Sequence, residues 1–116
     1  MATIPLSISL QGNTIVVYNG NQVVNDLTVQ PGDELQFTSD RMWAVQFITE
    51  GPPGNSTRVS PPVSVSGIRG GPNQASLVQI SSNAVRGMRW DYVVCVVDDN
   101  GYLVTDDPDI VIAPRS

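Results

Sequence analysis

The sequence predicts an all-β protein, and two observations lead to that prediction. The apolar residues include 17 valines and eight isoleucines, and these β-branched side chains favour strands. Apolar and polar residues also alternate along short segments between Gly, Pro, Asn and Asp, without a helical period. A chain of 116 residues has room for one core. We therefore expect a single domain over residues 1–116, a β-sandwich of about seven to ten short strands.

In the first half of the chain, each predicted strand ends at a turn signal. Gln11-Gly12, Asn19-Gly20-Asn21 and Pro31-Gly32-Asp33 separate segments of alternating polarity, as turns between neighbouring strands do. Trp43, Val45 and Phe47 share one face of the segment that follows. The predicted strands here are residues 4–10, 13–18, 22–30 with a break at Asn25-Asp26, 34–38 and 43–49.

In the second half, composition changes along the chain. Ten of the 24 residues from 51 to 74 are glycine or proline, so we expect mostly loop there, with a short edge strand at 63–68. Residues 91–97 form the most apolar segment and are expected at the centre of a sheet, buried on both faces. The remaining predicted strands are residues 75–80, 102–105 and 109–113, and their spacing is typical of antiparallel sheets.

The composition excludes several classes of function. Six arginines, eleven carboxylates and no lysine or histidine give a net charge of −5. Binding to nucleic acid or to an anionic membrane requires a basic surface, so neither partner is expected. Without imidazole or amine side chains, the chain lacks the usual general base, the commonest metal ligand and Schiff-base chemistry. We expect a non-catalytic protein without a cofactor.

The sequence also bears on the cellular compartment. Cys95 is the single cysteine, so no internal disulfide can form. The first ten residues lack a positive segment followed by an unbroken apolar core, and no run reaches the roughly 18 apolar residues of a membrane span. As it stands the chain is expected in the cytoplasm, although an exported chain without its signal peptide would read the same way.

Three segments together resemble the cupredoxin family of Greek-key β-sandwiches. Residues 29–37, Val-Gln-Pro-Gly-Asp-Glu-Leu-Gln-Phe, are similar to the turn and strand of that family. Residues 43–47, Trp-Ala-Val-Gln-Phe, are similar to its His-Asn-Val strand, and residues 92–95, Tyr-Val-Val-Cys, to its late Tyr-to-Cys strand. The resemblance covers about half of the chain and implies a Greek-key sandwich. A Pro-Gly-Asp turn before an alternating strand also suits an immunoglobulin-like sandwich.

The copper ligands that this resemblance would imply are missing. A blue-copper site needs two imidazoles and a thiolate, usually with a weak thioether. Trp43 and Ala44 stand where the first imidazole would be, and neither histidine nor methionine follows Cys95. Cys95 is also out of phase with Tyr92, because it lies three positions after Tyr92 along an alternating strand. We therefore expect no copper, and we interpret Cys95 as a small residue of the core.

Charge is segregated along the chain. Residues 51–90 contain four arginines and no carboxylate, whereas residues 91–116 contain six aspartates and one arginine. If this segregation persists in space, opposite poles would steer copies of the molecule head to tail, which predicts a self-assembling homo-oligomer. The alternative is that these arginines fold back onto aspartates of the same chain. The interface candidates are Arg58, Arg69, Arg86, Arg89, Trp90, Asp106, Asp107 and Asp109.

A ligand-binding module is the second hypothesis. The 51–74 loop and Trp90, which follows a Gly-Met-Arg segment and could be exposed, would offer an aromatic surface for a carbohydrate or a peptide. Calcium is a further candidate ligand, because carboxylates gather around one predicted hairpin. Ordinary turn chemistry, which favours aspartate in hairpin loops, is the preferred explanation of these positions. The candidate calcium ligands are Asp98, Asp99, Asp106, Asp107 and Asp109.

Overall fold

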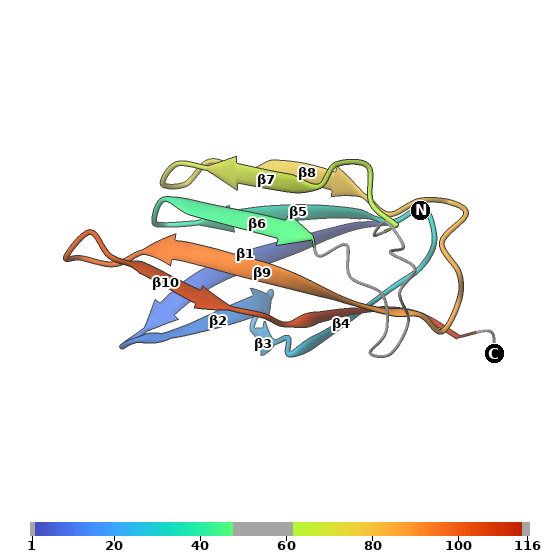
Figure 1. Cartoon of the computed structure of the whole chain (residues 1–116), viewed down its shortest axis with the longest axis horizontal. Coiled ribbons are helices and arrows are strands. Elements are labelled where there is room, and N and C mark those ends of the chain that lie inside the picture. The colour runs from blue at the N-terminus through green and yellow to red at the C-terminus, as the bar shows by residue number, and fades with distance from the viewer. Residues whose placement is uncertain (1, 48–61, 115–116) are drawn as a thin grey trace, which may run out of the picture.

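The structure is a computed structural model that describes residues 2–47 and 62–114. The described residues form eleven strands and no helix (Figure 1). Accordingly, no helix in these two ranges is long and apolar enough to cross a membrane. The strands are β1 (Thr3–Gln11), β2 (Thr14–Asn19), β3 (Gln22–Val23), β4 (Asp26–Val29), β5 (Glu34–Ser39), β6 (Trp43–Phe47), β7 (Gly67–Gly70), β8 (Ser76–Gln79), β9 (Arg89–Val97), β10 (Leu103–Asp106) and β11 (Asp109–Ile112).

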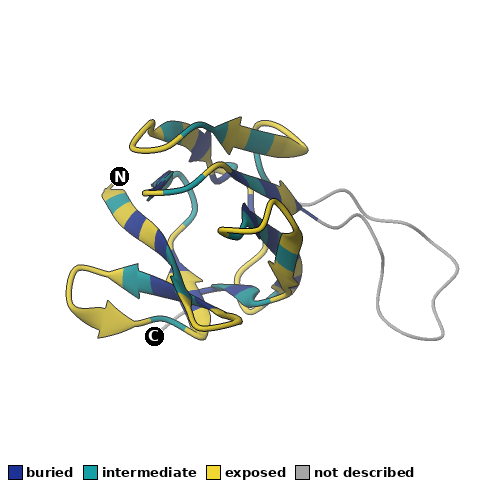
Figure 2. Ribbon diagram, turned by 90° about the vertical axis from the view of Figure 1, so that its left-hand side faces the viewer, coloured by how far each residue is buried: buried dark blue, intermediate teal, exposed yellow. Residues whose placement is uncertain are grey.

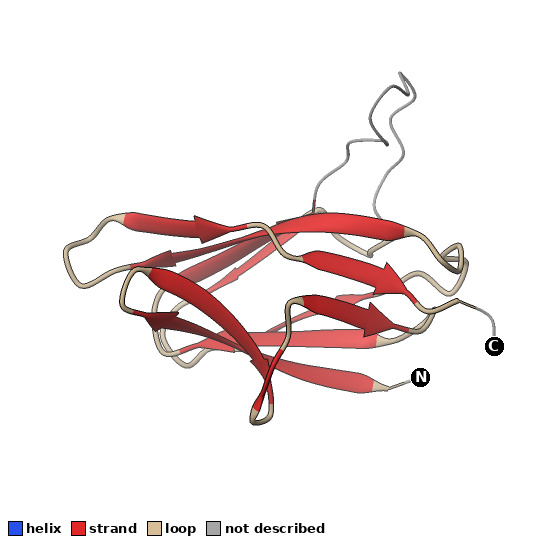
Figure 3. Ribbon diagram, turned by 90° about the horizontal axis from the view of Figure 1, so that it is seen from below, coloured by secondary structure: helices blue, strands red, loops and turns tan. Residues whose placement is uncertain are grey.

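These strands form two sheets that pack face to face, so the predicted all-β sandwich is confirmed (Figure 3). The first sheet has the order β3-β2-β1-β5-β8, and the second has the order β4-β11-β9-β6-β7 with β10 also paired to β9. Each sheet contains one parallel pair, β1 with β5 and β4 with β11. The antiparallel expectation was therefore wrong for these two pairs, because they join strands that are distant in sequence rather than neighbouring hairpin strands.

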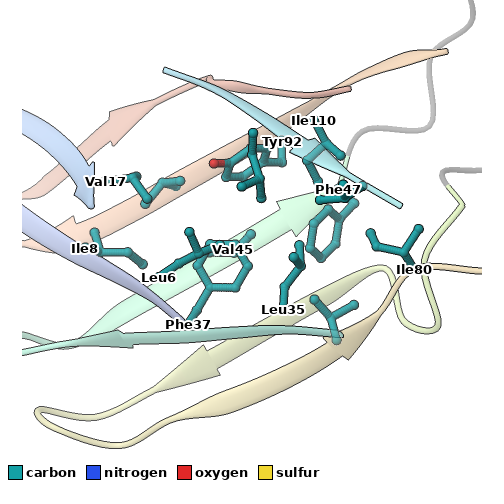
Figure 4. Close-up of a cluster of buried hydrophobic side chains, with 14 of the residues drawn as sticks. Leu6, Ile8, Val17, Leu35, Phe37, Val45, Phe47, Ile80, Tyr92 and Ile110 are labelled. Carbon is teal, nitrogen blue, oxygen red and sulfur yellow. The ribbon is translucent and has the colours of Figure 1, made fainter. Parts of the chain in front are cut away.

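The core lies between the sheets and is built by strict alternation along the strands (Figure 2). In β5, Leu35 and Phe37 are buried, and in β9 Tyr92 is buried beside them. The Phe37 and Tyr92 rings meet edge to face with centroids 6.0 Å apart. Figure 4 shows these side chains converging from both sheets. The predicted inward face of residues 43–47, with Trp43, Val45 and Phe47 buried, is confirmed.

The Pro-Gly-Asp turn before β5 is fixed by a buried carboxylate. Asp33 Oδ2 accepts a hydrogen bond from the Gln30 amide at 2.8 Å, and Asp33 Oδ1 accepts one from the Ala2 amide at 3.1 Å. Gly32, between them, has φ of 88°, a left-handed conformation that glycine adopts without strain. The side chain thereby satisfies amides from both the turn and the start of β1, which fixes where β1 and β5 come together.

Two strand predictions need correction. The edge strand expected at 63–68 lies at Gly67–Gly70, and Val63 makes only an isolated bridge with Ile80. Pairing with β6 decides this position: a Cβ atom on Gly67 would lie 3.2 Å from the Val45 carbonyl oxygen, so glycine permits the close approach. The segment 91–97 is central as expected, but β9 is buried on its inner face only, and its outer face is half-buried.

The strands β10 and β11 lie one after the other along the same partner, β9. Leu103 to Asp106 pair with Val97 to Val94, and Asp109 to Val111 pair with Asp91 to Arg89. The strand is interrupted between β10 and β11 at Asp107 and Pro108, where proline has no N–H to donate to the sheet. The far side of β11 pairs with β4, whereas none of the described strands pairs with the far edge of β10, which lies near β2. This open edge positions both surfaces described next.

Candidate interaction surfaces

The first candidate surface is an apolar groove on the outer face of the second sheet. Outward-facing residues of β10, β9, β6 and β7 are in register there, so that Thr105, Cys95, Ala44 and Arg69 form one row across the four strands. The two residues in the middle of this row, Cys95 and Ala44, have small side chains, and a hollow of about 540 Å³ lies over them. The groove is lined by Met42, Ala44, Arg69, Cys95, Val97 and Leu103, among others.

The rim of this apolar groove is unusually exposed for such side chains. Met42 is 60% exposed and Leu103 is 70% exposed, and the two stand on opposite sides of Val97. Arg69 is the charged residue of the groove, and none of the described carboxylates forms an ion pair with it. The groove therefore combines apolar area with one cation that is free to meet an anionic group.

Cys95 lies in the floor of this groove and not in the core, which corrects the sequence interpretation. Its half-buried side chain faces outward because Tyr92 and Val94 take the inward positions of β9. Burial raises the pKa of the Cys95 thiol above its ordinary value. A thiol with a raised pKa is a poor nucleophile at neutral pH.

The second candidate surface is an acidic groove at the open side of the sandwich. It lies where β2 and β3 face the junction of β10 and β11, and has a volume of about 420 Å³. Carboxylates of Asp106, Asp107 and Asp109 line it together with Asp26, over apolar residues that include Ile15, Val17, Val24 and Pro108. Asp106 and Asp107 are exposed and make no ion pair with any described arginine.

A buried hydroxyl lies beneath the acidic groove. The Tyr92 side chain is fully buried, and its hydroxyl has no hydrogen-bond partner among the described residues. Figure 4 shows the hydroxyl oxygen pointing toward Val17, which lines the groove. Burial, followed by the charges of Asp106 and Asp109, raises the pKa of Tyr92 well above its ordinary value. The hydroxyl therefore stays neutral and keeps lone pairs that could accept a hydrogen bond from a donor.

Two arginines pair with aspartates of the same chain. Arg89 Nη1 donates to Asp109 Oδ2 at 2.7 Å and lies 3.2 Å from Asp26 Oδ1. Arg41 Nη1 donates to Asp99 Oδ1 at 2.8 Å. The sequence left open whether arginines would fold back onto the chain's own aspartates, and for Arg89 the structure gives that outcome. Such exposed pairs contribute little to stability, but they remove Arg89 from the set of free cations.

Three carboxylates stand side by side next to Arg89. Asp26, Asp109 and Asp91 occupy matching positions of β4, β11 and β9, all on the outer face. A hydrogen bond with Asp109 is the main cause that raises the pKa of Asp91 to about 6, followed by burial and by the charges of Asp109 and Asp107. The same hydrogen bond, with that from Arg89, lowers the pKa of Asp109. When the two carboxyl groups carry one proton between them, that proton is therefore on Asp91.

The remaining predicted cations are Arg58, Arg69 and Arg86. Arg58 lies outside the described residues. Arg86 is exposed, and its Nη1 donates to two neutral acceptors, Gln30 Oε1 at 2.9 Å and the Ala113 carbonyl oxygen at 3.4 Å. None of the described carboxylates pairs with Arg69 or Arg86. Charges of both signs therefore remain without ion-pair partners among the described residues, at Arg69 and Arg86 and at Asp106 and Asp107.

Trp90 is not an exposed aromatic surface, and this prediction was wrong. It is only 7% exposed, because β9 already begins at Arg89 and alternation from Tyr92 turns Trp90 inward. Its Nε1 has no hydrogen-bond partner among the described residues. Trp43, expected in the core, is buried there and donates from Nε1 to the Gln74 carbonyl oxygen at 3.1 Å.

The five candidate calcium ligands do not come together. Asp98 Oδ1 accepts from the amides of Asn100 and Tyr102, both at 2.9 Å, and so closes the β9–β10 turn. Asp99 pairs with Arg41, as described above. Asp106, Asp107 and Asp109 lie at the other end of β10, in the acidic groove. Across residues 2–47 and 62–114, no three His, Cys, Asp or Glu side chains are grouped so that they could hold a metal ion.

Sequence reasoning missed Met42, Leu103 and Asp91 as surface residues of interest. The period of two along 93–97 could have indicated the outward row at Cys95 and Val97, but the partners of that row lie on distant strands.

No model of a known protein family matches this chain, and no similar curated protein was found.

Proposed function

We propose that this protein acts without catalysis, through its surface, by associating with copies of itself. The observation that carries the proposal is the position of the charges that internal pairing leaves over. Arg86 is bonded to the Ala113 carbonyl, just after β11 ends, whereas Asp107 lies just before β11 begins. β11 is about 13 Å long at about 3.3 Å per residue, so Asp107 and the Ala113 carbonyl that accepts from Arg86 lie near its two ends. Such an arrangement favours contact between the unlike ends of two molecules.

The open edge of β10 supports the same proposal. An unpaired edge strand exposes backbone donors and acceptors that another chain can use, and proteins usually block such edges with lysine or proline. The segment Leu103–Asp106 contains neither, and Leu103 is exposed at the groove rim. Low charge elsewhere on the chain, with 15% charged residues, adds to this tendency because fewer like charges keep copies apart.

Sedimentation velocity over a wide range of concentrations, at low and high salt, tests the proposal. We expect a species larger than 12.4 kDa that grows with concentration and dissociates as salt screens the charges. Leu103→Asp should weaken association by placing a charge at the open edge, whereas Leu77→Asp, at an exposed leucine of the first sheet, is the matched control. A monomer at every concentration and salt would contradict self-association.

Ligand binding in the apolar groove is the second candidate function. The observation in its favour is that Arg69, Gly70, Gly71 and Gln74, which fall within the segment 51–74, form one wall of the hollow. An apolar ligand or peptide side chain with a carboxylate would suit the floor and Arg69. Anilinonaphthalene sulfonate, an apolar anion, is a suitable probe. Its fluorescence should rise on binding to the wild type and less with Arg69→Gln, and equal binding by both would oppose this function.

We also propose that the sandwich is of the cupredoxin kind but without copper. In support, the residues that carry the resemblance fall on β4, β5, β6 and β9, and β6 and β9 are neighbours. Trp43 faces the core and Ala44 lies beside Cys95 on the outer face, and neither of these two side chains can supply an imidazole ligand. Addition of Cu²⁺ should produce no intense thiolate-to-copper absorption band, and appearance of such a band would refute the proposal.

A further inference from the structure

The turn that carries Arg86 is a rigid, positively charged projection. The Gly87 amide donates to the Ile112 carbonyl at 2.8 Å, and the Ile112 amide donates to the Met88 carbonyl at 2.8 Å, so the turn is fastened to β11. Val85 projects from it and is 61% exposed. An exposed valine beside an exposed arginine, on a turn hydrogen-bonded to β11, has less conformational freedom to lose on binding than a free loop.

Arg86 also has N–H groups that are available to donate further hydrogen bonds. Both of its hydrogen bonds within the chain come from Nη1 and go to neutral carbonyl oxygens. A guanidinium carries five N–H groups, so Nε and Nη2 remain available for a carboxylate. Because its acceptors within the chain are uncharged, an arriving carboxylate would form the first charge-assisted bonds of this arginine.

The acidic groove offers the complementary surface on the same molecule. Its exposed Asp106 and Asp107 lack cation partners among the described residues, and apolar Val24 and Pro108 lie beside them. The buried Tyr92 hydroxyl points toward Val17, which lines this groove, and has no hydrogen-bond partner among the described residues. Carboxylates around apolar area suit an arginine that follows an apolar residue.

We propose that the Val85–Arg86 turn of one copy docks in the acidic groove of a second copy, with Arg86 on Asp106 and Asp107 and Val85 over Val24 and Pro108. This contact rests on the self-association proposed above and specifies its surface. Turn and groove are different surfaces of one molecule, so the contact is heterologous, and it either closes on itself or propagates into longer assemblies.

Charge reversal on each side, followed by mixing, tests this contact. Arg86→Glu and Asp107→Arg should each raise the apparent dissociation constant for self-association by about tenfold or more, the effect of losing a charge-assisted pair. An equimolar mixture of the two variants should restore a 1:1 complex, because the reversed charges then match. Arg69→Glu is the control, since it changes net charge as Arg86→Glu does at an arginine outside the contact. Asp107 has no internal partner, so its variant remains informative if Arg86→Glu unfolds.

The outcomes separate this contact from the broader proposal. If the wild type associates but both reversed variants associate equally well, the contact is wrong and another surface, such as the β10 edge, mediates association. If the wild type stays monomeric throughout, self-association itself fails and the contact with it. Loss of association in both variants without recovery in the mixture would also overturn the pairing. Binding of a basic peptide to monomeric wild type, abolished by Asp107→Arg, would assign the groove to a different partner.

Discussion

The carboxyl pair on the outer face gives a sharp prediction for Asp91→Asn. At neutral pH, Asp91 and Asp109 repel each other when both are charged, and among the described arginines Arg89 lies close enough to compensate. The asparagine amide can donate to Asp109 as a protonated Asp91 does, but it cannot become charged. We therefore expect Asp91→Asn to stabilise the protein at pH 7, where the wild type has lost the shared proton.

The size of this stabilisation and the pH range over which it appears follow from the pKa of Asp91. Because its folded pKa of about 6 exceeds the ordinary 3.8, the contribution of Asp91 is complete below 3.8 and is lost as pH rises to about 6. Taken at face value, this interval corresponds to about 3 kcal/mol. Solvent screens the exposed Asp91, so we expect about 1 kcal/mol. The lowered pKa of Asp109 acts oppositely, since its contribution is lost as pH falls through that pKa, below 3.8.

Urea unfolding of wild type and Asp91→Asn at pH 4 and pH 7 measures this effect. The variant should exceed the wild type by about 1 kcal/mol at pH 7, or roughly 4 °C in melting temperature, and match it near pH 4. Asp40→Asn, which removes one exposed carboxylate elsewhere, controls for the change in net charge. A difference that is the same at both pH values, or a variant less stable at pH 7, would refute the shared-proton account.

Three further substitutions test the packing, each by urea denaturation. Gly70→Ala should destabilise by about 1–3 kcal/mol, because its Cβ would lie 2.5 Å from Trp43 Nε1; a neutral result would contradict that close approach. Ser39→Ala should cost about 1–2 kcal/mol, since the buried Ser39 hydroxyl donates to the Ile8 carbonyl at 2.7 Å; unchanged stability would mean that the carbonyl finds another donor. Tyr92→Phe removes an unpartnered buried hydroxyl and should be neutral or stabilising by up to about 1 kcal/mol; a large loss would reveal a hidden partner.

Which side chains of each strand point into the core was largely predictable from the sequence. A period of two places alternate side chains on one face, so Leu35 and Phe37, and likewise Trp43, were predictable as core residues. Trp90 and Cys95 show how the same signal was misread. Alternation extended from Tyr92 puts Trp90 inside and Cys95 outside, but Gly-Met-Arg before Trp90 suggested a loop, and valines on both sides of Cys95 suggested a core.

The candidate surfaces were much less predictable, because they depend on pairing between distant strands. Nothing in the spacing of Asp26, Asp91 and Asp109 indicates that three carboxylates would stand in one row. That row follows from the order β4-β11-β9, in which the parallel partner comes from the other end of the chain. The distribution of charges along the sequence predicted a basic and an acidic pole. The register of the paired strands is needed to show which arginines form ion pairs with aspartates and which do not.

The place of β11 between β4 and β9 also affects how the protein can be synthesised. During translation, β4 emerges early, yet β11, its one partner among the described strands, is completed when Ile112 has left the ribosome. Until then Leu27 and Val29 have no neighbouring strand to shield them, and a nascent chain exposes them to chaperones or to other nascent chains. Slowing elongation between β4 and β11 should therefore lengthen a vulnerable interval without allowing the second sheet to form earlier.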